Sequence, residues 1–166
     1  GLVLATMMVP GQVLLIPNFL ILSNLGLLDT YAALIVPWTA SVFTIFLMRQ
    51  FFMTIPEDLW DAARIDGSSR FRYLWQVVVP LSKPVFITAG IFDFLNNWNS
   101  LLWPLIVTST PSKRTLMVGL QNLSTDAGTE FHILMAASCF AVLPIVAAFF
   151  FLQRFFIEGI ARTGLK

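Results

Sequence analysis

Two groups of side chains in this sequence have the types and spacing to do chemistry, and the first is a polar stripe within an apolar stretch. Asp93, Asn96, Asn97 and Ser100 occur at i, i+3, i+4 and i+7, so a helix would bring them to one face. Amides and carboxylates are suitable hydrogen-bonding partners for a hydroxyl-bearing solute. The stripe, with the neighbouring Asn99, is therefore a candidate lining for a solute path. Polar side chains also join helices within membranes, and both interpretations stay open.

The second group is a charged segment that has helix signals at both ends. Thr54 and Glu57 have the spacing of a capping box. Pro56 falls in the first turn, where a missing N–H costs little. Gly67 can adopt the left-handed conformation that ends a helix. We therefore expect a short helix over about residues 55–66.

This helix has a surface that another protein could approach closely. It combines two small residues, two larger apolar residues one turn earlier, and two opposite charges three positions apart: Ala62, Ala63, Leu59, Trp60, Asp61 and Arg64. A rigid helix of this kind can insert into the cleft of a partner protein. A helix lying on lipid headgroups has a similar composition, so composition leaves both interpretations open.

A second short helix should follow the glycine. Ser68 or Ser69 can cap its start, and we expect it to end before Pro80. Its apolar face is given by residues at helical spacing, namely Phe71, Leu74, Trp75 and Val78. The sequence thus predicts two short helices joined by a glycine turn.

Patterns of other chemistries are absent from the sequence. There is no phosphate-binding loop of the Gly-x4-Gly-Lys-Ser/Thr type. His132 has no companion ligand for a metal, and no Ser/His/Asp arrangement recurs. A net charge of +1 without a basic patch argues against nucleic acid. We therefore expect a chain that is not an enzyme and binds no cofactor or metal.

The elements that must position these groups are membrane helices. Of the 166 residues, 57% are hydrophobic and only 11% are charged, against about 25% charged in soluble domains. Four apolar stretches have about the 20 residues that a helix needs to cross a bilayer, at about residues 2–22, 31–52, 84–108 and 131–153. We expect an all-α membrane protein, a polytopic bundle of four transmembrane helices forming one domain over residues 1–166. Because Gly1 lies inside an apolar run, we expect an N-terminal truncation.

The charges orient this bundle. With four spans, the loop at about residues 53–83 and the C-terminal tail lie on one side. That side holds eight of the ten Lys and Arg residues: Arg49, Arg64, Arg70, Arg72, Lys83, Arg154, Arg162 and Lys166. The opposite side holds Lys113 and Arg114. The positive-inside rule therefore predicts that the loop and the C-terminus are cytoplasmic.

The loop resembles the EAA motif of permeases from ATP-binding-cassette (ABC) importers. In that family Glu-Ala-Ala is followed by three residues and Gly, and later by an apolar residue and Pro. The matching residues here are Asp61-Ala62-Ala63-Arg64-Ile65-Asp66-Gly67 and Val79-Pro80. Further runs resemble the carbohydrate-uptake class, of the type of the smaller maltose permease subunit: Trp98-Asn99, Leu102-Trp103-Pro104-Leu105, Arg114-Thr115-Leu116 and Val118-Gly119-Leu120.

The resemblance implies a sugar or oligosaccharide importer that works by alternating access in the bacterial or archaeal cytoplasmic membrane. It implies about six transmembrane helices in the full chain, a second permease subunit in a heterodimer, an ABC ATPase dimer that holds ATP and Mg²⁺, and an extracytoplasmic sugar-binding protein. The ATPase-coupling residues it implies are Glu57, Leu59, Asp61, Ala62, Ala63, Asp66, Gly67 and Pro80.

Three residues depart from the family pattern, and the mildest departure is Ser68, which stands where the family often has Ala. Asp61 stands in the place of the motif's Glu, which keeps the charge and shortens the reach by one methylene. Asp93 stands where the family more often has an uncharged residue. An ionisable residue in a membrane helix is expensive and usually faces protein or water. The alternative function is therefore an ion-coupled secondary transporter that uses Asp93.

Overall fold

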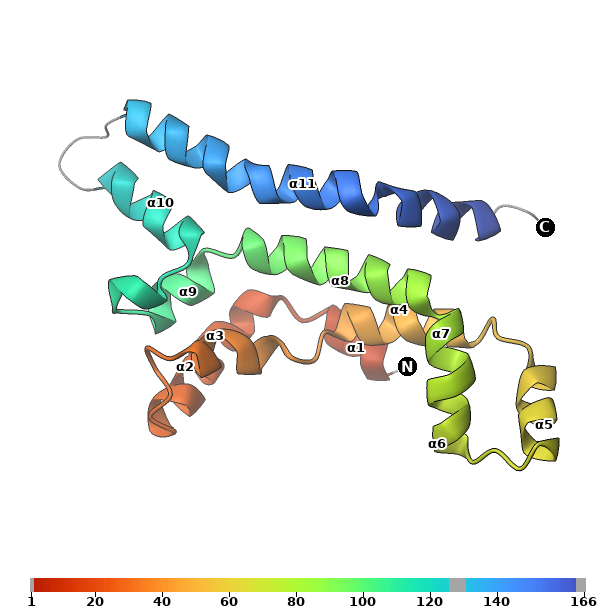
Figure 1. The fold of residues 1–166 in the computed structure, drawn as a ribbon. Coiled ribbons are helices and arrows are strands. Elements are labelled where there is room, and N and C mark those ends of the chain that lie inside the picture. The colour runs from red at the N-terminus through yellow and green to blue at the C-terminus, as the bar shows by residue number, and fades with distance from the viewer. Residues whose placement is uncertain (1, 126–130, 164–166) are drawn as a thin grey trace.

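The computed structural model describes residues 2–125 and 131–163, and every regular element within these ranges is helical. The all-α prediction is confirmed for this part of the chain. Lys166, which the charge argument used, lies outside the described residues. Figure 1 shows the helices laid out along one long direction, with α5 and α6 at one end and α2, α3 and α9 at the other.

The elements follow the chain in this order: α1 (Leu2–Met7), η1 (Gly11–Leu14), α2 (Leu15–Asn24), α3 (Tyr31–Ile35), η2 (Val36–Trp38), α4 (Val42–Phe52), α5 (Glu57–Ile65), α6 (Arg70–Tyr73), the π-turn η3 (Leu74–Val78), α7 (Val79–Leu81), α8 (Lys83–Trp98), α9 (Leu102–Val107), η4 (Pro111–Lys113), α10 (Leu116–Thr125) and α11 (Phe131–Thr163).

The predicted spans are more broken than the apolar runs indicated. One stretch within α11, Phe131–Phe151, is long and apolar enough to cross a membrane. Two further candidates are bent pairs, Tyr31–Trp38 with Val42–Phe52 at 42° and Arg70–Leu81 with Lys83–Trp98 at 73°. By length and composition the described residues thus offer one span, or up to three if each bent pair is one span.

Proline and irregular backbone explain the difference from four continuous spans. Pro10 follows the end of α1, and because its ring fixes φ and removes a donor, the first apolar run splits into α1 and the Gly11–Asn24 helix. The third run is interrupted at residues 99–101, between α8 and α9. Apolar composition therefore located the helical segments without locating their breaks.

The helices pack as a layer in which α8 lies between α4 and α11 (Figure 1). Phe43 of α4 meets Phe92 of α8 with ring centroids 5.4 Å apart. Trp98, at the end of α8, donates its indole N–H to the carbonyl of Ala141 in α11, at 3.1 Å. Long stretches of apolar surface remain exposed, above all Phe149, Phe150 and Phe151 on α11. An apolar face of this extent suits lipid or a partner subunit.

Candidate functional sites

The start of α5 is not built as a capping box. The Thr54 hydroxyl donates to the carbonyl of Phe51 at 2.7 Å, at the end of the preceding helix. Pro56 occupies the N-cap position with φ −60° and ψ 137°, and no side chain caps the helix there. The prediction of a capping box from Thr54 and Glu57 is therefore wrong, because Pro56 and not Thr54 is the N-cap residue. Glu57 and Asp58 lie in the first turn, where negative charge is favourable.

The end of α5 matches its prediction. Gly67 has φ +72°. The Ser68 N–H donates to the Ala63 carbonyl at 2.8 Å, and the Gly67 N–H donates to the Arg64 carbonyl at 3.0 Å. This pair of bonds is a Schellman motif, which satisfies the last carbonyls of a helix. A well-defined stop at Gly67 fixes the direction in which the chain leaves α5.

The helical segment after the glycine begins as expected and ends later. The Ser69 hydroxyl accepts the N–H of Arg72 at 3.3 Å, which confirms the cap. The segment does not end before Pro80; it continues through η3 and α7 to Leu81. The wider π-turn precedes the proline, and Pro80 then lies in the first turn of α7, where its missing N–H is tolerated. The buried Ser82 hydroxyl donates to the Val78 carbonyl at 2.6 Å, at the bend into α8.

Trp60 packs between α5 and α6 instead of facing outward. Its ring lies 5.0 Å from that of Tyr73, with planes tilted by 59°. Ala63 on the same side of α5 is half-buried, whereas Ala62 is exposed. The expectation that Trp60 adds bulk to a free surface is therefore wrong. Only one of the two alanines leaves the backbone of α5 open.

The outer face of α5 consists of Asp58, Ala62 and Ile65, which fall on one side of a helix with 3.6 residues per turn. Ile65 is 87% exposed and Leu59 at the flank is 39% exposed. The sequence analysis missed Ile65 as a surface residue, although its spacing of three from Ala62 was visible. The exposed side chains of Ile65 and Ala62 form an apolar surface. A protein partner that covers this surface gains free energy from the burial of its apolar area.

Charged side chains lie beside the exposed Ala62 and Ile65. Asp61 and Arg64 form the predicted pair at 3.7 Å, and each side chain is 65% exposed, so water screens most of the attraction. Asp66, Gly67 and Pro80 are exposed as well. The coupling residues implied by the resemblance thus lie on the accessible part of the loop, with the half-buried Ala63 as the exception.

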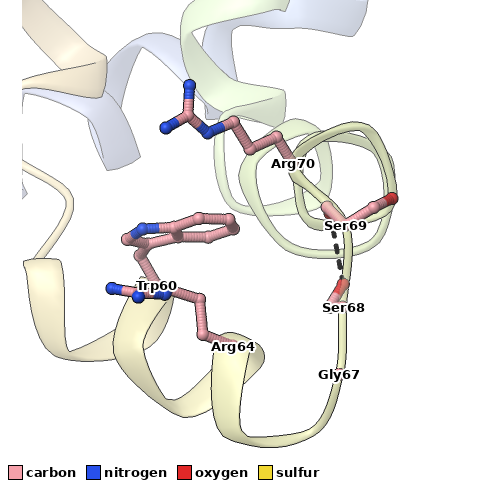
Figure 2. Close-up of a pocket in the computed structure, with 6 residues that line it drawn as sticks. All are labelled: Trp60, Arg64, Gly67, Ser68, Ser69 and Arg70. Atoms are coloured by element: carbon pink, nitrogen blue, oxygen red, sulfur yellow. Dashed lines mark hydrogen bonds between the residues drawn. The ribbon is translucent and has the colours of Figure 1, made fainter.

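A cleft of about 570 Å³ separates α5 from the start of α6. Figure 2 shows the Trp60 ring between the side chains of Arg64 and Arg70, whose guanidinium groups lie on the same side of the cleft. The far wall is Gly67, Ser68 and Ser69, where the Ser68 hydroxyl donates to the Ser69 carbonyl at 3.4 Å. The inner side of the loop therefore carries two basic side chains, in contrast to the outer face of α5, where Ala62 and Ile65 are exposed.

The polar stripe on α8 is divided between two kinds of contact. Asp93 is half-buried and accepts the Thr44 hydroxyl at 2.9 Å, which links α8 to α4. Asn97 donates its side-chain amide to the backbone carbonyl of Asp93 at 2.7 Å, and Asn99 does the same to Leu95 at 2.8 Å. Asp93 therefore makes the helix-joining contact that the sequence analysis left open.

The other stripe residues are placed differently from one another. Asn96 is exposed on α8. Because α8 ends at Trp98, Asn99 and Ser100 lie in the break before α9 and not on the helical face. The predicted i, i+3, i+4, i+7 stripe is thus shortened to its first three members. The amides of Asn96, Asn97 and Asn99 remain accessible to a solute, and a solute path along them stays a prediction.

A third polar cluster, which the sequence analysis missed, lies at the opposite end from α5. The Asp29 carboxylate accepts the backbone N–H groups of Ser109 at 2.9 Å and Thr110 at 3.0 Å, and also the Thr110 hydroxyl. Lys113 donates to the Asp29 carbonyl. The Thr110 hydroxyl, followed by the N–H groups of Thr110 and Ser109, lowers the pKa of Asp29 from 3.8 to about 2. The partners are some 80 residues apart, so no local pattern signals them.

Comparison with known proteins gives a consistent result across the chain. The model of the family described as "Binding-protein-dependent transport system inner membrane component" matches residues 1–162. The arabinooligosaccharides transport system permease protein of Bacillus subtilis (strain 168) is 39% identical over 165 residues, covering 99% of this chain and 59% of that protein. The sn-glycerol-3-phosphate transport system permease protein of Yersinia enterocolitica is 38% identical over 164 residues, covering 98% and 58%.

A solved structure is similar as well. It is that of a bacterial ABC transporter involved in the import of the acidic polysaccharide alginate, with a TM-score of 0.76 and 27% identity. The match covers 85% of this chain and 55% of that one. The chain thus spans a little under three fifths of the length of the curated relatives it matches.

Proposed function

This chain belongs to the family of binding-protein-dependent transport system inner membrane components, and from that premise we propose that it is part of the permease subunit of an ATP-driven carbohydrate importer. The carbohydrate class is supported by the names of relatives, which are permeases for arabinooligosaccharides and for sn-glycerol-3-phosphate, and by the alginate importer. The accessible amides of Asn96, Asn97 and Asn99 suit a hydroxyl-rich solute.

The observation that carries the proposal is the outer face of α5. It joins an exposed alanine to a nearly bare isoleucine on a helix whose end is fixed by Gly67. A separate ATPase, holding ATP and Mg²⁺, would cover this face and the flanking Leu59 and Asp61. We infer that α5 and α6 move as one piece when the ATPase closes, because Trp60 packs on Tyr73.

The rest of the mechanism follows from this docking. Residues 53–83 and the C-terminus would lie in the cytoplasm, and the pore would form against a second permease subunit. Closure of the ATPase dimer would draw the α5 helices together and switch the permeases between inward-open and outward-open states. An extracytoplasmic binding protein would deliver the sugar. The four spans expected here, and about six in the full chain, belong to this proposal.

Docking is tested by placing bulk on the outer face of α5. Ala62→Trp in the full-length permease should abolish co-purification of the ATPase, because Ala62 is exposed and the partner must approach the backbone there. Gln76→Trp is the matched control, at an exposed position on the neighbouring segment. Ala63→Trp is a poorer test because Ala63 is half-buried within the loop. Retention of the ATPase by the Ala62→Trp permease would refute the proposed docking.

The energy source of uptake distinguishes the ATP-driven importer from the ion-coupled alternative at Asp93. Uptake by intact cells that survives a proton uncoupler and stops when ATP is depleted supports the importer. Uptake that collapses with the proton gradient, and with Asp93→Asn, supports the alternative. Because Asp93 already accepts a hydrogen bond from Thr44, Thr44→Val is the control for a purely packing effect of the Asp93 substitution.

A further inference from the structure

Apart from the segment α5–α7, most of the described helices form two groups, and the chain passes between these groups several times. One group, here called the cap, consists of η1, α2, α3, η2, α9 and η4. The other group, the body, consists of α1, α4, α8, α10 and α11. In the cap, α9 packs on α2 and on α3; in the body, α4 packs on α1 and α8, and α11 packs on α8 and α10. Figure 1 shows α2, α3 and α9 together at one end of the molecule.

Four links carry the chain between cap and body, and none of them continues a regular helix. They are residues 8–10, 39–41, 99–101 and 114–115. The second link accompanies the 42° bend between Tyr31–Trp38 and Val42–Phe52. At the third, Asn99 and Ser100 have already left α8. A change in direction at each link therefore needs no helix to be broken.

Asp29 fastens the two chain segments of the cap to each other. Besides its carboxylate bonds to Ser109 and Thr110, its own N–H donates to the Val107 carbonyl at 2.8 Å. Asp29 has φ +55° and is the one non-glycine residue with positive φ in the described ranges. A side chain tolerates that conformation only where surrounding contacts over-determine it. The cluster around Asp29 is thus a rigid junction between the α2–α3 turn and the α9–η4 loop.

An apolar core lies beneath this junction and reinforces it. Leu22, Ala33, Trp103 and Val107 are all buried and in contact. Trp103 donates its indole N–H to the Ala33 carbonyl at 2.9 Å, and its ring meets that of Trp38 edge-on at 6.0 Å. Segments separated by 70 residues are therefore joined both by packing and by a buried hydrogen bond.

The long-range hydrogen bonds described above each stay within one part. Asp29 with Thr110 and Trp103 with Ala33 belong to the cap, whereas Thr44 with Asp93 and Trp98 with Ala141 belong to the body. At the fourth link, the buried Thr115 hydroxyl has no hydrogen-bond partner among the described residues.

We propose that the cap moves as one rigid unit against the body during transport, turning at the four links, and that Asp29 is the positioning residue that keeps the cap rigid. The motion of the cap during transport rests on the proposed importer function. The rigidity of the cap rests only on the contacts of Asp29 and on the core around Trp103. The two statements can therefore fail separately.

The motion is tested with pairs of spin labels in the full-length permease, in a Cys139→Ser background because Cys139 is exposed. Leu20 and Leu105 are exposed cap positions, and Val142 is exposed on α11. Between the nucleotide-free and vanadate-trapped transporter, the Leu20–Leu105 distance should stay the same while the Leu105–Val142 distance shifts. A shift within the cap, or no shift in either pair of a transporter that does trap vanadate, overturns the inference.

The role of Asp29 is tested in the permease alone, so it does not depend on an ATPase. Asp29→Asn should broaden the Leu20–Leu105 distance distribution, because an amide cannot accept all the bonds that the carboxylate accepts. Thr110→Val should broaden it as well, and Thr110→Ser should restore the narrow distribution by returning the hydroxyl. Asp58→Asn, at the opposite end of the molecule, should leave it unchanged. An equally narrow distribution in Asp29→Asn would refute the assignment, whereas failure to bind any ATPase would refute the proposed function only.

Discussion

The two ends of this molecule are stabilised in opposite ways. At the α5–α6 end the hydrogen bonds join residues five or fewer positions apart, as at Gly67 and Ser69, and apolar side chains such as Ile65 stay exposed. At the cap the bonds join residues 70 to 84 positions apart over a buried core. The first end holds its own shape locally and offers a surface to a partner. The second has a small buried core of its own and is held together by contacts between distant parts of the chain.

The largest expected effect is a loss of stability in the cap. Trp103→Ala removes a side chain that is only 3% exposed and should cost about 3–5 kcal/mol of stability, because a cavity forms and the Ala33 carbonyl loses its donor. Trp75→Ala is the matched control on the loop, since Trp75 is 57% exposed. Thermal unfolding of the detergent-solubilised permease measures both. Equal losses of stability in Trp103→Ala and Trp75→Ala would contradict the contrast between the cap and the α5–α6 end.

A middle-sized effect is expected at the end of α5. Gly67→Val places a β-branched residue at φ +72° and should cost about 1–2 kcal/mol locally. Hydrogen exchange at the amides of Gly67 and Ser68, the donors of the Schellman bonds, should then rise by roughly 5- to 30-fold.

Gly90→Ala is the comparison for this substitution. Gly90 lies within α8 with nothing within 4 Å of an added methyl group, so alanine there should be neutral or stabilising by up to about 1 kcal/mol. If both glycine substitutions had the same effect, the left-handed conformation of Gly67 would not be what ends α5.

The smallest effect is a pH dependence of the cap. Because the pKa of Asp29 is lowered from 3.8 to about 2 in the folded chain, its bonds stabilise the cap fully above pH 3.8 and progressively less as the pH falls toward 2. The melting temperature of the unaltered permease should exceed that of Asp29→Asn by a constant margin between pH 6 and about 4. Below that range the margin should narrow. A margin that widens with acidification would contradict the assigned hydrogen bonds.

The same contrast explains which features were predictable from the sequence. The stop at Gly67 and the cap at Ser69 depend on a few neighbouring residues, so residue type and spacing were sufficient. The capping box failed because α5 begins at Glu57, two residues later than the spacing of Thr54 and Glu57 requires, and residue spacing alone does not fix the first helical residue. The breaks at residues 8–10 and 99–101 were missed because apolar composition is the same on both sides of a break.

Long-range features were out of reach for a different reason. Nothing in the sequence near Asp29 indicates that Thr110 lies beside it. The sequence around Trp60 likewise does not say whether its ring packs on Tyr73 or faces a partner protein. Asp93 stood out as an ionisable residue in an apolar stretch, but its contact with Thr44 crosses 49 positions. The sequence therefore located candidate side chains and could not choose among their contacts.

The π-turn at Leu74–Val78 has a consequence for how this loop tolerates insertions and deletions. A π-turn holds one residue more than the corresponding turn of an α-helix, so the loss of one residue there would leave a regular helix. Removing one residue from it would restore an α-helix and rotate α6, and with it α5, by about 100° around the helix axis relative to α7. Side chains on α5 would be unchanged, yet its outer face would point elsewhere. The number of residues between Ser69 and Pro80 therefore sets the direction in which the outer face of α5 points.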